Sequence, residues 1–374
     1  MNFQTYPFEK LQALVSDIPQ TPKISLTIGE PQFPTPALIC EALCKKVETL
    51  NKYPKTAGEN VLKEALLQFL QTRFSLTMDF DNIIATFGTR EVLFNFPQFF
   101  LFNKTNPTLA YPNPFYQIYE GAAIASRAKS IYMNLTAQND FKPYLTKEQM
   151  KTCDLVILNS PNNPTGSTLS LEELKVWVQN ALEYDFVILS DECYSEIYSH
   201  KPPASILEAS WAVGNQEFKN ILALNSISKR SSAPGLRSGF IAGDKAILKD
   251  YARYRTYVGC AIPLPLQYAA AVAWADEEHP KFFQEQYREN LALAQEILGV
   301  QVPCATFYVW LFVGDDLQWT RELLTKEEIL VLPGSYLSRT DSKGINPGKG
   351  YVRLALVYEK EIIKDALLRI KKCL

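Results

Sequence analysis

The sequence predicts an α/β protein: a large domain in which helices flank a mainly parallel sheet, and a smaller α/β domain. Short apolar runs alternate with stretches of helical periodicity from about residue 80 to 243, as in βα units. The length of 374 residues suggests about two domains. Pro263-Leu-Pro265 breaks the chain before a long helical region. We therefore expect an N-terminal arm (1–34) that joins the small domain, a large domain (35–265) and a small C-terminal domain (266–374).

The N-terminal part of the chain is expected to hold an arm and two helices. Residues 1–34 are rich in proline and lack clear periodicity. A helix is expected to begin at Thr35-Pro36, where the hydroxyl can cap it and proline suits the first turn. Apolar residues continue at helical spacing to Leu50, and a second amphipathic helix is expected over Glu59–Phe74.

Six apolar runs are predicted to form the strands of the large domain. They are Asn82–Phe87, Thr108–Tyr111, Asp154–Leu158, Phe186–Asp191, Ile221–Leu224 and Phe240–Ala242. Ser170-Leu-Glu-Glu173 matches a capping box and predicts a helix through Leu182. Ligands of open α/β sheets bind beyond the carboxyl ends of the strands, so the polar residues after these runs are the candidate site.

The C-terminal part is expected to mix helices and strands. A helical region from Leu266 to Leu298 is predicted to bridge the two domains. Strands are expected over Thr306–Phe312, Ile329–Leu332 and Val352–Leu356, followed by a final helix over Glu359–Lys372.

The composition is that of an ordinary soluble globular protein and argues against several functions. The net charge is −2 and the sequence has no basic block, so it lacks the cluster of positive charge that is typical of nucleic-acid-binding proteins. Met1–Leu14 lacks the apolar core of a signal peptide, and no span approaches the ~20 apolar residues of a membrane helix. No G-x-G-x-x-G motif follows a strand, which argues against a dinucleotide-binding protein.

The cysteines and histidines suggest neither disulfides nor a metal. Seven cysteines form an odd, unpatterned set that favours a reducing, cytoplasmic location. Cys40 and Cys44 are four residues apart, as on one helix face, and are expected in the core. His200 and His279 are too few for a zinc site or a histidine-based triad, and both are expected at the surface.

The segment from Asn225 to Gly239 concentrates the chemistry of the chain. Lys229 follows a predicted strand, and most lysines are solvated surface charges. Here, however, Ser226, Ser228 and Arg237 could all bind one phosphate. An amine nucleophile beside a phosphate cradle suggests a Schiff base between Lys229 and pyridoxal 5′-phosphate.

This cofactor requires partners that other strand ends can supply. A carboxylate must face the pyridine nitrogen, and Asp191 ends an apolar strand. Tyr194 and Asn163 can donate hydrogen bonds to the phenolic oxygen of the cofactor. The alternatives remain that Asp191 caps a helix or lies in a turn, and that Asn163 belongs to an ordinary Asn-Pro turn.

Two further strand ends complete the set. Gly88, Thr89 and Arg90 open a helix, where backbone N–H groups can bind an anion. The same residues could equally form a strand-to-helix turn that binds no ligand. Tyr116 can stack on a planar ring, and it can equally be a core aromatic. Because four strand ends in one chain carry complementary groups, we favour binding of pyridoxal 5′-phosphate over separate structural roles for these residues.

These residues resemble the class I and II aminotransferases of pyridoxal-phosphate fold type I, nearly end to end. The matching motifs are Ile28–Pro36, Tyr53 with Gly58, Asn162-Asn-Pro-Thr-Gly166, Asp191-Glu-Cys-Tyr194, Ser226-Ile-Ser-Lys229, Gly334 and Arg353. The resemblance implies the fold type I architecture, a dimer with shared active sites, and amino-acid and 2-oxo-acid substrates.

The resemblance also implies a role for each matching residue. Lys229 would form the Schiff base, Asp191 would pair with the pyridinium, Asn163 and Tyr194 would bind the phenolic oxygen, and Tyr116 would stack on the ring. Gly88, Thr89, Arg90, Ser226, Ser228 and Arg237, with Tyr53 of a second subunit, would hold the phosphate. Arg353, helped by the backbone around Gly29 and by Asn163, would bind the substrate α-carboxylate. Arg353 could otherwise be a surface charge.

Within the family, the chain resembles the N-succinyl-diaminopimelate aminotransferases of bacterial lysine synthesis. Lys229-Arg-Ser231 and Pro234–Phe240 carry this similarity, and Ser232 departs from it because that branch tends to have asparagine there. The substrates would be N-succinyl-LL-2,6-diaminopimelate and 2-oxoglutarate or glutamate, which each carry a distal carboxylate. Arg230 is the favoured partner for it and Arg90 the second, although each could simply pack or meet a phosphate or surface acid.

Other functions stay open from the sequence alone. The nearest are an aminotransferase for aspartate, alanine or an aromatic amino acid, and a β-lyase on the same fold. A regulatory module that binds the cofactor without catalysis is weaker, because no helix-turn-helix segment or linker flanks the core. An α/β protein with another phosphate ligand would form no adduct at Lys229.

Overall fold

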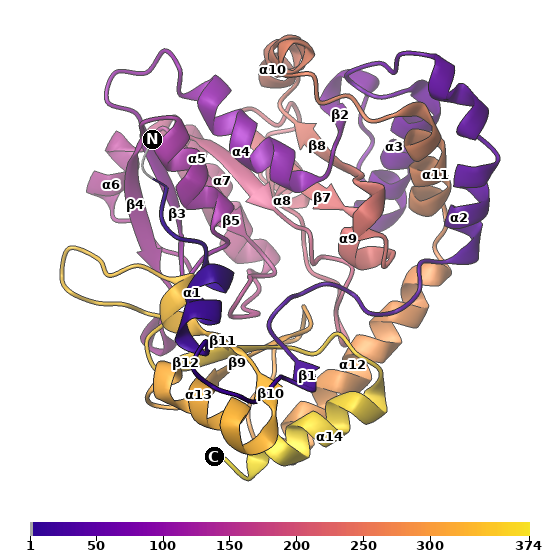
Figure 1. Cartoon of the computed structure of the whole chain (residues 1–374). Helices are drawn as coiled ribbons and strands as arrows, with labels where there is room; N and C mark the ends of the chain where they lie inside the picture. The colour runs from indigo at the N-terminus through magenta and orange to yellow at the C-terminus, as the bar shows by residue number, and fades with distance from the viewer. Residues whose placement is uncertain (1–2) are drawn as a thin grey trace.

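A seven-stranded sheet forms the centre of the larger lobe (Figure 1). The computed structural model describes residues 3–374. The strand order is β2-β8-β7-β6-β5-β3-β4, and only β8 runs antiparallel to its neighbours. The strands are β2 (Ile83–Thr86), β3 (Thr108–Asn113), β4 (Lys129–Asn134), β5 (Leu155–Asn159), β6 (Val187–Asp191), β7 (Ile221–Ser226) and β8 (Gly239–Gly243). The parallel strands therefore end at one edge of the sheet.

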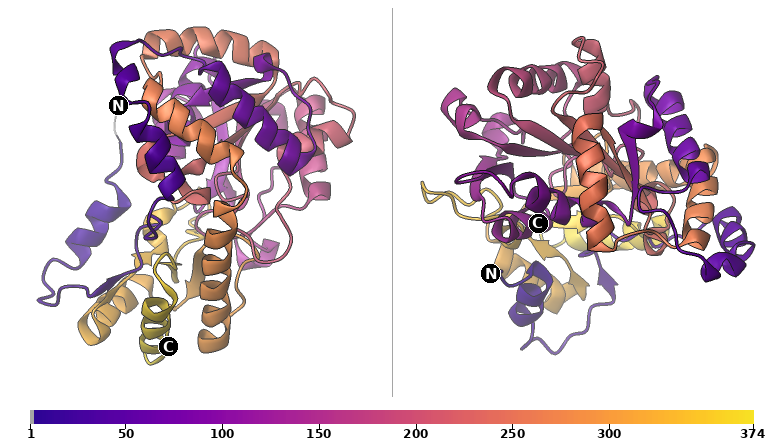
Figure 2. Two further views of the ribbon diagram at one scale, coloured as in Figure 1. Left: turned by 90° about the vertical axis from the view of Figure 1, so that its right-hand side faces the viewer. Right: turned by 90° about the horizontal axis from the view of Figure 1, so that it is seen from above.

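Helices cover both faces of this sheet (Figure 2). Alternate residues of each strand serve different cores: Val156 and Leu158 pack in one, and Leu155 and Ile157 in the other. The first core includes α2 (Ala37–Cys44), α3 (Asn60–Phe74), α6 (Lys147–Thr152), α7 (Leu171–Tyr184), α8 (Ile206–Ala212) and α11 (Leu264–Ala275). The second includes α4 (Thr89–Phe100), α5 (Ile118–Ala125) and α10 (Lys245–Val258). Strands buried on both faces explain the continuous apolar runs.

The smaller lobe combines the C-terminal elements with the N-terminal arm. An antiparallel sheet, β11-β12-β9, has the strands β9 (Tyr308–Phe312), β11 (Leu332–Pro333) and β12 (Tyr351–Ala355). Its helices are α12 (His279–Leu298), α13 (Asp316–Glu327) and α14 (Lys360–Lys371). From the arm, β1 (Ile24–Ser25) pairs with β10 (Ile329–Leu330), and α1 (Pro7–Leu14) packs on β11 (Figure 1). The arm thus joins the small lobe.

The predicted fold class is confirmed, and the capping box is present as expected, since Ser170 accepts a hydrogen bond from the N–H of Glu173. The expected elements did not include α1, β4, α10 and α13. The first expected helix begins one residue later than predicted, at Ala37, because Thr35 donates its hydroxyl to the carbonyl of Ser232.

Three expectations about the location of residues are wrong. Cys40 and Cys44 are exposed, because α2 buries mainly Ile39. His279 is buried at the start of α12, its side chain only 6% exposed. The expected boundary at 265/266 falls one helix early: α11 packs on α2 and α3, and the chain enters the small lobe only with α12.

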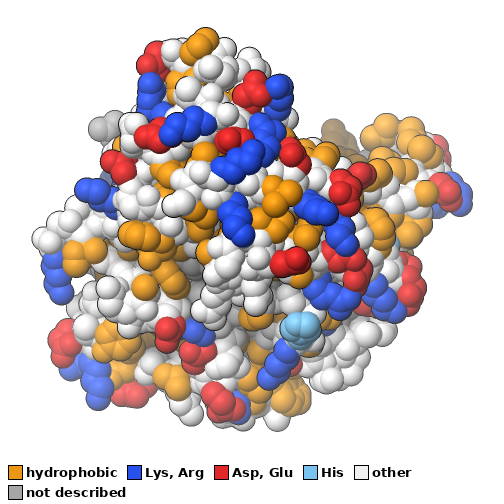
Figure 3. Space-filling model, turned by 90° about the horizontal axis from the view of Figure 1, so that it is seen from below, with side chains coloured by type: hydrophobic (Ala, Val, Ile, Leu, Met, Phe, Trp, Pro, Cys, Tyr) orange, Lys and Arg blue, Asp and Glu red, His pale blue; other side chains and the backbone are white. Residues whose placement is uncertain are grey.

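The surface carries mixed charge. On the face shown in Figure 3, basic and acidic side chains are interspersed, in keeping with the net charge of −2. Within residues 3–374 no helix is long and apolar enough to cross a membrane, and no group of histidine, cysteine and acidic side chains is arranged to hold a metal. All seven cysteines are free. The cytoplasmic location stays a prediction.

Candidate active site

A cavity of about 1120 Å³ lies between the lobes, at the carboxyl ends of the parallel strands. It brings together side chains that are far apart in the sequence. Those predicted from the sequence that line it are Gly29, Thr89, Arg90, Tyr116, Asn163, Asp191, Tyr194, Ser226, Ser228, Lys229, Arg237 and Arg353. Such an edge is where open α/β sheets bind ligands.

Lys229 lies in the short helix α9 (Ile227–Arg230), which Ser226 caps by accepting a hydrogen bond from the N–H of Ser228. Its Nζ donates to the carbonyl oxygen of Gly29 at 2.5 Å, so the amine is held at the wall of the cavity. Burial lowers the pKa of Lys229 to about 8. A substantial fraction of this amine is therefore neutral, and nucleophilic, near neutral pH.

Asp191 ends β6 and is almost completely buried. Tyr119, from α5, donates its hydroxyl to Oδ2 of Asp191 at 2.8 Å. Burial raises the pKa of Asp191, because it removes water from the carboxylate and no lysine or arginine of residues 3–374 forms an ion pair with it. A protonated ring nitrogen placed against this group would supply the missing charge. Sequence reasoning missed Tyr119, whose helical spacing reads as a core position.

The phosphate end of the cavity is built from two turns. Ser226 and Ser228 place their hydroxyl oxygens 2.9 Å apart, and Arg237 donates to the carbonyl of Phe87 at 3.2 Å. Gly88 caps α4 with a φ of +75°, and a side chain there would meet Nη2 of Arg237 at 2.2 Å. Glycine is thus required for the guanidinium to approach the start of a helix. Hydroxyls, a guanidinium and helix N–H groups together make an anion site.

Arg353, on β12, is held by neutral groups only. Nη1 donates to Oδ1 of Asn163 at 2.8 Å, Nη2 donates to the carbonyl of Thr27 at 2.5 Å, and the guanidinium lies 4.5 Å from the ring centre of Tyr308. Within residues 3–374 no carboxylate lies within 4.0 Å of it, and its buried Nε has no hydrogen-bond partner. A buried guanidinium without an acid is a site for an anionic ligand.

The wall next to Arg353 depends on a close approach of the backbone. A side chain at Gly29 would meet the hydroxyl of Tyr308 at 1.8 Å. Tyr308 also contacts Tyr194, their hydroxyl oxygens 3.0 Å apart. Tyr308 was not singled out from the sequence, because a tyrosine in an apolar strand carries no distinguishing signal.

The mouth of the cavity is formed by separate segments. Tyr116 accepts a hydrogen bond from Nε of Arg90 at 2.5 Å, and burial raises the pKa of its hydroxyl to about 12. Tyr6 and Phe8, from the start of α1, and Glu30 complete this rim. The exposed guanidinium of Arg90 is the cation nearest the solvent here.

Two predicted residues lie elsewhere. Arg230 points away from the cavity and is fully buried, with Glu277 at 3.1 Å and Glu196 at 4.0 Å, so the expectation that it binds a substrate carboxylate is wrong. Sequence neighbours on one helical turn face different directions, which proximity to Lys229 alone does not reveal. Tyr53 is fully exposed and lies outside the cavity of its own chain.

Comparison with known proteins identifies the family. The family described as aminotransferase class I and II matches residues 21–369. This chain belongs to the family of class I and II aminotransferases.

Relatives of known structure and sequence support the assignment over the whole chain. The structure of the aminotransferase AspB from Helicobacter pylori 26695 covers 100% of this aminotransferase and 99% of its own chain, with 49% identity and a TM-score of 0.97. An aminotransferase from Neisseria meningitidis Z2491 covers 99% and 98%, with 41% identity and a TM-score of 0.93. The LL-diaminopimelate aminotransferase of Aquifex aeolicus (strain VF5) is 30% identical over 93% of this chain and 90% of its own length.

Aminotransferases of this fold depend on pyridoxal 5′-phosphate, and the residues of the cavity fit it. Lys229 offers the amine, Asp191 a buried carboxylate without a cation, and Ser226, Ser228 and Arg237 a phosphate pocket. When bound, the cofactor supplies an aldehyde that takes up the amino group and a ring that accepts electrons from the substrate α-carbon. The predicted enzyme class and cofactor are confirmed.

Proposed function

We propose that this aminotransferase transfers the amino group of N-succinyl-LL-2,6-diaminopimelate to 2-oxoglutarate in bacterial lysine synthesis. One observation carries the proposal: the cavity has an arginine at each end. Arg353 lies inside without an acidic partner, and Arg90 lies at the mouth. Both substrates carry an α-carboxylate and a distal carboxylate. With Arg230 paired with Glu196 and Glu277, Arg90 remains as the partner for the distal group.

The roles of the chain's own residues in this reaction follow from their positions. Arg353 orients the α-carboxylate, helped by Asn163. Lys229 would move the proton at the substrate α-carbon, since its lowered pKa lets it act as a base. Asp191 keeps the ring nitrogen protonated, and Tyr119 holds that carboxylate in place.

A second candidate is unsuccinylated LL-diaminopimelate, the substrate named for several relatives. Glu30 favours it, because this carboxylate lines the mouth and could pair with the free distal ammonium group. Aspartate is a further candidate, since one relative is an aspartate aminotransferase.

The proposed enzyme is a homodimer in which Tyr53 reaches the phosphate of the neighbouring subunit. Tyr53 is 101% exposed, with Leu50 and Val47 exposed beside it. A fully exposed tyrosine next to apolar side chains is consistent with an interface. Analytical ultracentrifugation tests the dimer, and Tyr53→Phe should weaken cofactor binding if the hydroxyl serves the phosphate.

Single-turnover reactions test the substrate. The absorbance of the bound cofactor is followed with N-succinyl-LL-diaminopimelate, LL-diaminopimelate, aspartate and glutamate as donors. We expect the succinylated donor to have the highest kcat/KM. Higher values for LL-diaminopimelate or aspartate would contradict the proposal. Repeated steady-state turnover without a 2-oxo acid acceptor would instead indicate a β-lyase, because an aminotransferase stops after one turnover when no acceptor is present.

Two matched variants locate the specificity. Arg90→Gln should raise the KM for the succinylated donor about five- to tenfold, the size of one exposed charge interaction, and leave alanine as donor unaffected. Glu30→Gln should leave the succinylated donor unchanged and impair LL-diaminopimelate. The opposite pattern would favour the second candidate.

A further inference from the structure

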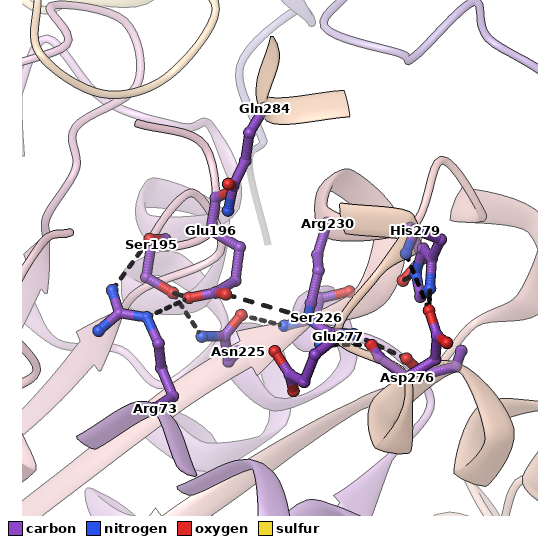
Figure 4. Close-up of polar contacts among 12 residues, drawn as sticks. Arg73, Ser195, Glu196, Asn225, Ser226, Arg230, Asp276, Glu277, His279 and Gln284 are labelled. Carbon is purple, nitrogen blue, oxygen red and sulfur yellow. Dashed lines mark hydrogen bonds and ion pairs between the residues drawn. The ribbon is translucent and has the colours of Figure 1, made fainter. Parts of the chain in front are cut away.

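A buried polar network lies on the side of α9 that faces away from the cavity (Figure 4). Lys229 faces the cavity, while the next two residues, Arg230 and Ser231, face the junction between α11 and α12. The reaction as described uses none of these contacts.

Arg230 binds the end of α11. Its Nη1 donates to the carbonyl of Ala273 at 2.7 Å, and its Nη2 donates to the carbonyl of Asp276 at 3.0 Å and to Oε1 of Glu277 at 3.1 Å. The last carbonyls of a helix lack partners within it and carry negative partial charge, so a guanidinium there satisfies both. The guanidinium also lies against the rings of Phe69 and Trp274, which contact each other.

Ser231 makes a second tie to the same junction. Its hydroxyl lies 2.8 Å from Nε2 of His279, and Nδ1 of His279 lies 2.6 Å from Oδ2 of Asp276. Burial lowers the pKa of His279. A neutral imidazole that donates a hydrogen bond from Nδ1–H to the carboxylate can accept a hydrogen bond from the serine hydroxyl at Nε2. One tautomer therefore satisfies both contacts.

The junction is also where the two lobes meet. α12 begins at His279, and its first turns place Phe283 and Tyr287 in an aromatic cluster with Tyr194 at the cavity. Further along, Leu291 and Ala294 belong to the core of the small lobe. The residues that Arg230 holds therefore lie on one of the two chain connections between the lobes; the other is the segment between β1 and α2.

We propose that Arg230 is a positioning residue: it ties α9 to the α11–α12 junction, so that the arrangement of the two lobes fixes the place of the Lys229 amine. The inference rests on the aminotransferase family and on these contacts, and it is independent of the substrate proposed above. Arginine suits this role because its fork reaches three acceptors at once.

The test measures how fast Lys229 captures its cofactor. The chain freed of cofactor is mixed with pyridoxal 5′-phosphate, and the absorbance of the bound form is followed from pH 6 to pH 10. We expect Arg230→Met to slow capture about 100-fold, the effect of a displacement of about 1 Å, and to move the midpoint of the pH profile. Arg230→Lys should lie between that variant and the wild type.

Arg73→Met is the matched control. Arg73 is a partly buried cation, its side chain 13% exposed, and it pairs with the same acid, Glu196, at 2.8 Å, but its other hydrogen bonds go to the carbonyls of Ser195 and Pro203. This variant should lose thermal stability and still capture the cofactor within about twofold of the wild-type rate. Equal capture rates in Arg230→Met and Arg73→Met would overturn the proposal.

A milder variant decides the question if the Arg230 variants do not fold. Ser231→Ala removes one hydrogen bond of the second tie and leaves Arg230 in place. Capture should slow about fivefold, in line with one hydrogen bond. An unchanged rate and an unchanged pH midpoint would overturn the proposal.

Discussion

The cofactor end and the mouth of the cavity differ in how their side chains are fixed. At the cofactor end, Asp191, Ser226 and Lys229 come directly from strand ends or the helix that follows, and each is bound by other protein groups. At the mouth, Arg90 and Glu30 are exposed: Arg90 is the second residue of α4 and donates to Tyr116, and Glu30 lies on the N-terminal arm.

This difference separates chemistry from specificity. The rigid end must hold one cofactor in one orientation, so its geometry is set by the sheet. The mouth meets whichever substrate enters, and its charges can change without disturbing the sheet. Variants at the cofactor end should therefore impair every donor, and variants at the mouth only some of them.

The largest effect is expected for Lys229→Ala. Without the amine, proton transfer at the α-carbon loses its base, and kcat should fall by at least about 10⁴-fold for every donor. The folded variant should still bind pyridoxal 5′-phosphate non-covalently, and borohydride should fix no cofactor to it. Normal turnover in this variant would remove the proposed role.

Asp191→Asn comes next. The amide keeps the shape and can still accept from Tyr119, but it cannot hold the ring nitrogen protonated. Removing one partner of a buried ion pair costs about 3–5 kcal/mol, so kcat should fall roughly 200- to 5,000-fold with every donor. Tyr119→Phe is the graded companion, with an expected loss of about tenfold from one lost hydrogen bond to a charged group. Equal rates for Asp191→Asn and the wild type would show that this end is not fixed by charge.

Arg353→Lys should weaken all donors alike, because every amino acid carries an α-carboxylate. Lysine keeps the charge but lacks the fork, and a loss of about 2 kcal/mol or more in kcat/KM is expected. Donor saturation curves measure it. A loss confined to donors with a distal carboxylate would mean that Arg353 binds the distal carboxylate and not the α-carboxylate.

The smallest effect is one of pH. Because burial lowers the pKa of Lys229 to about 8, the amine is protonated below that pH and neutral above it. The rate of cofactor capture should therefore rise about tenfold per pH unit below pH 8 and level off above it. A midpoint near the ~10.4 of a free lysine would mean that the wall of the cavity is solvated.

Six of the seven strands of the large sheet lie where apolar runs of the sequence predicted them, and polar residues that follow several of these runs line the cavity. The roles of these residues in binding and catalysis stay predictions. Asp191 and Lys229 each follow such a run. Tyr119 and Tyr308 were not predicted as site residues. An aromatic residue in an amphipathic helix or an apolar strand is expected in the core, and the sequence does not show what its hydroxyl binds. Arg230 was misplaced because a four-residue helix turns adjacent side chains to opposite sides. Such contacts depend on segments distant in the chain.

Strands β7 and β8 pair with Ser226 directly opposite Gly239. Residues 227–238 therefore form a loop whose two ends are paired in the sheet, and both Lys229 and Arg237 lie in this loop. A substitution inside that loop leaves the pairing of β7 with β8 in place. A single residue inserted into β7 would instead turn the side chains beyond it to the opposite face of the sheet.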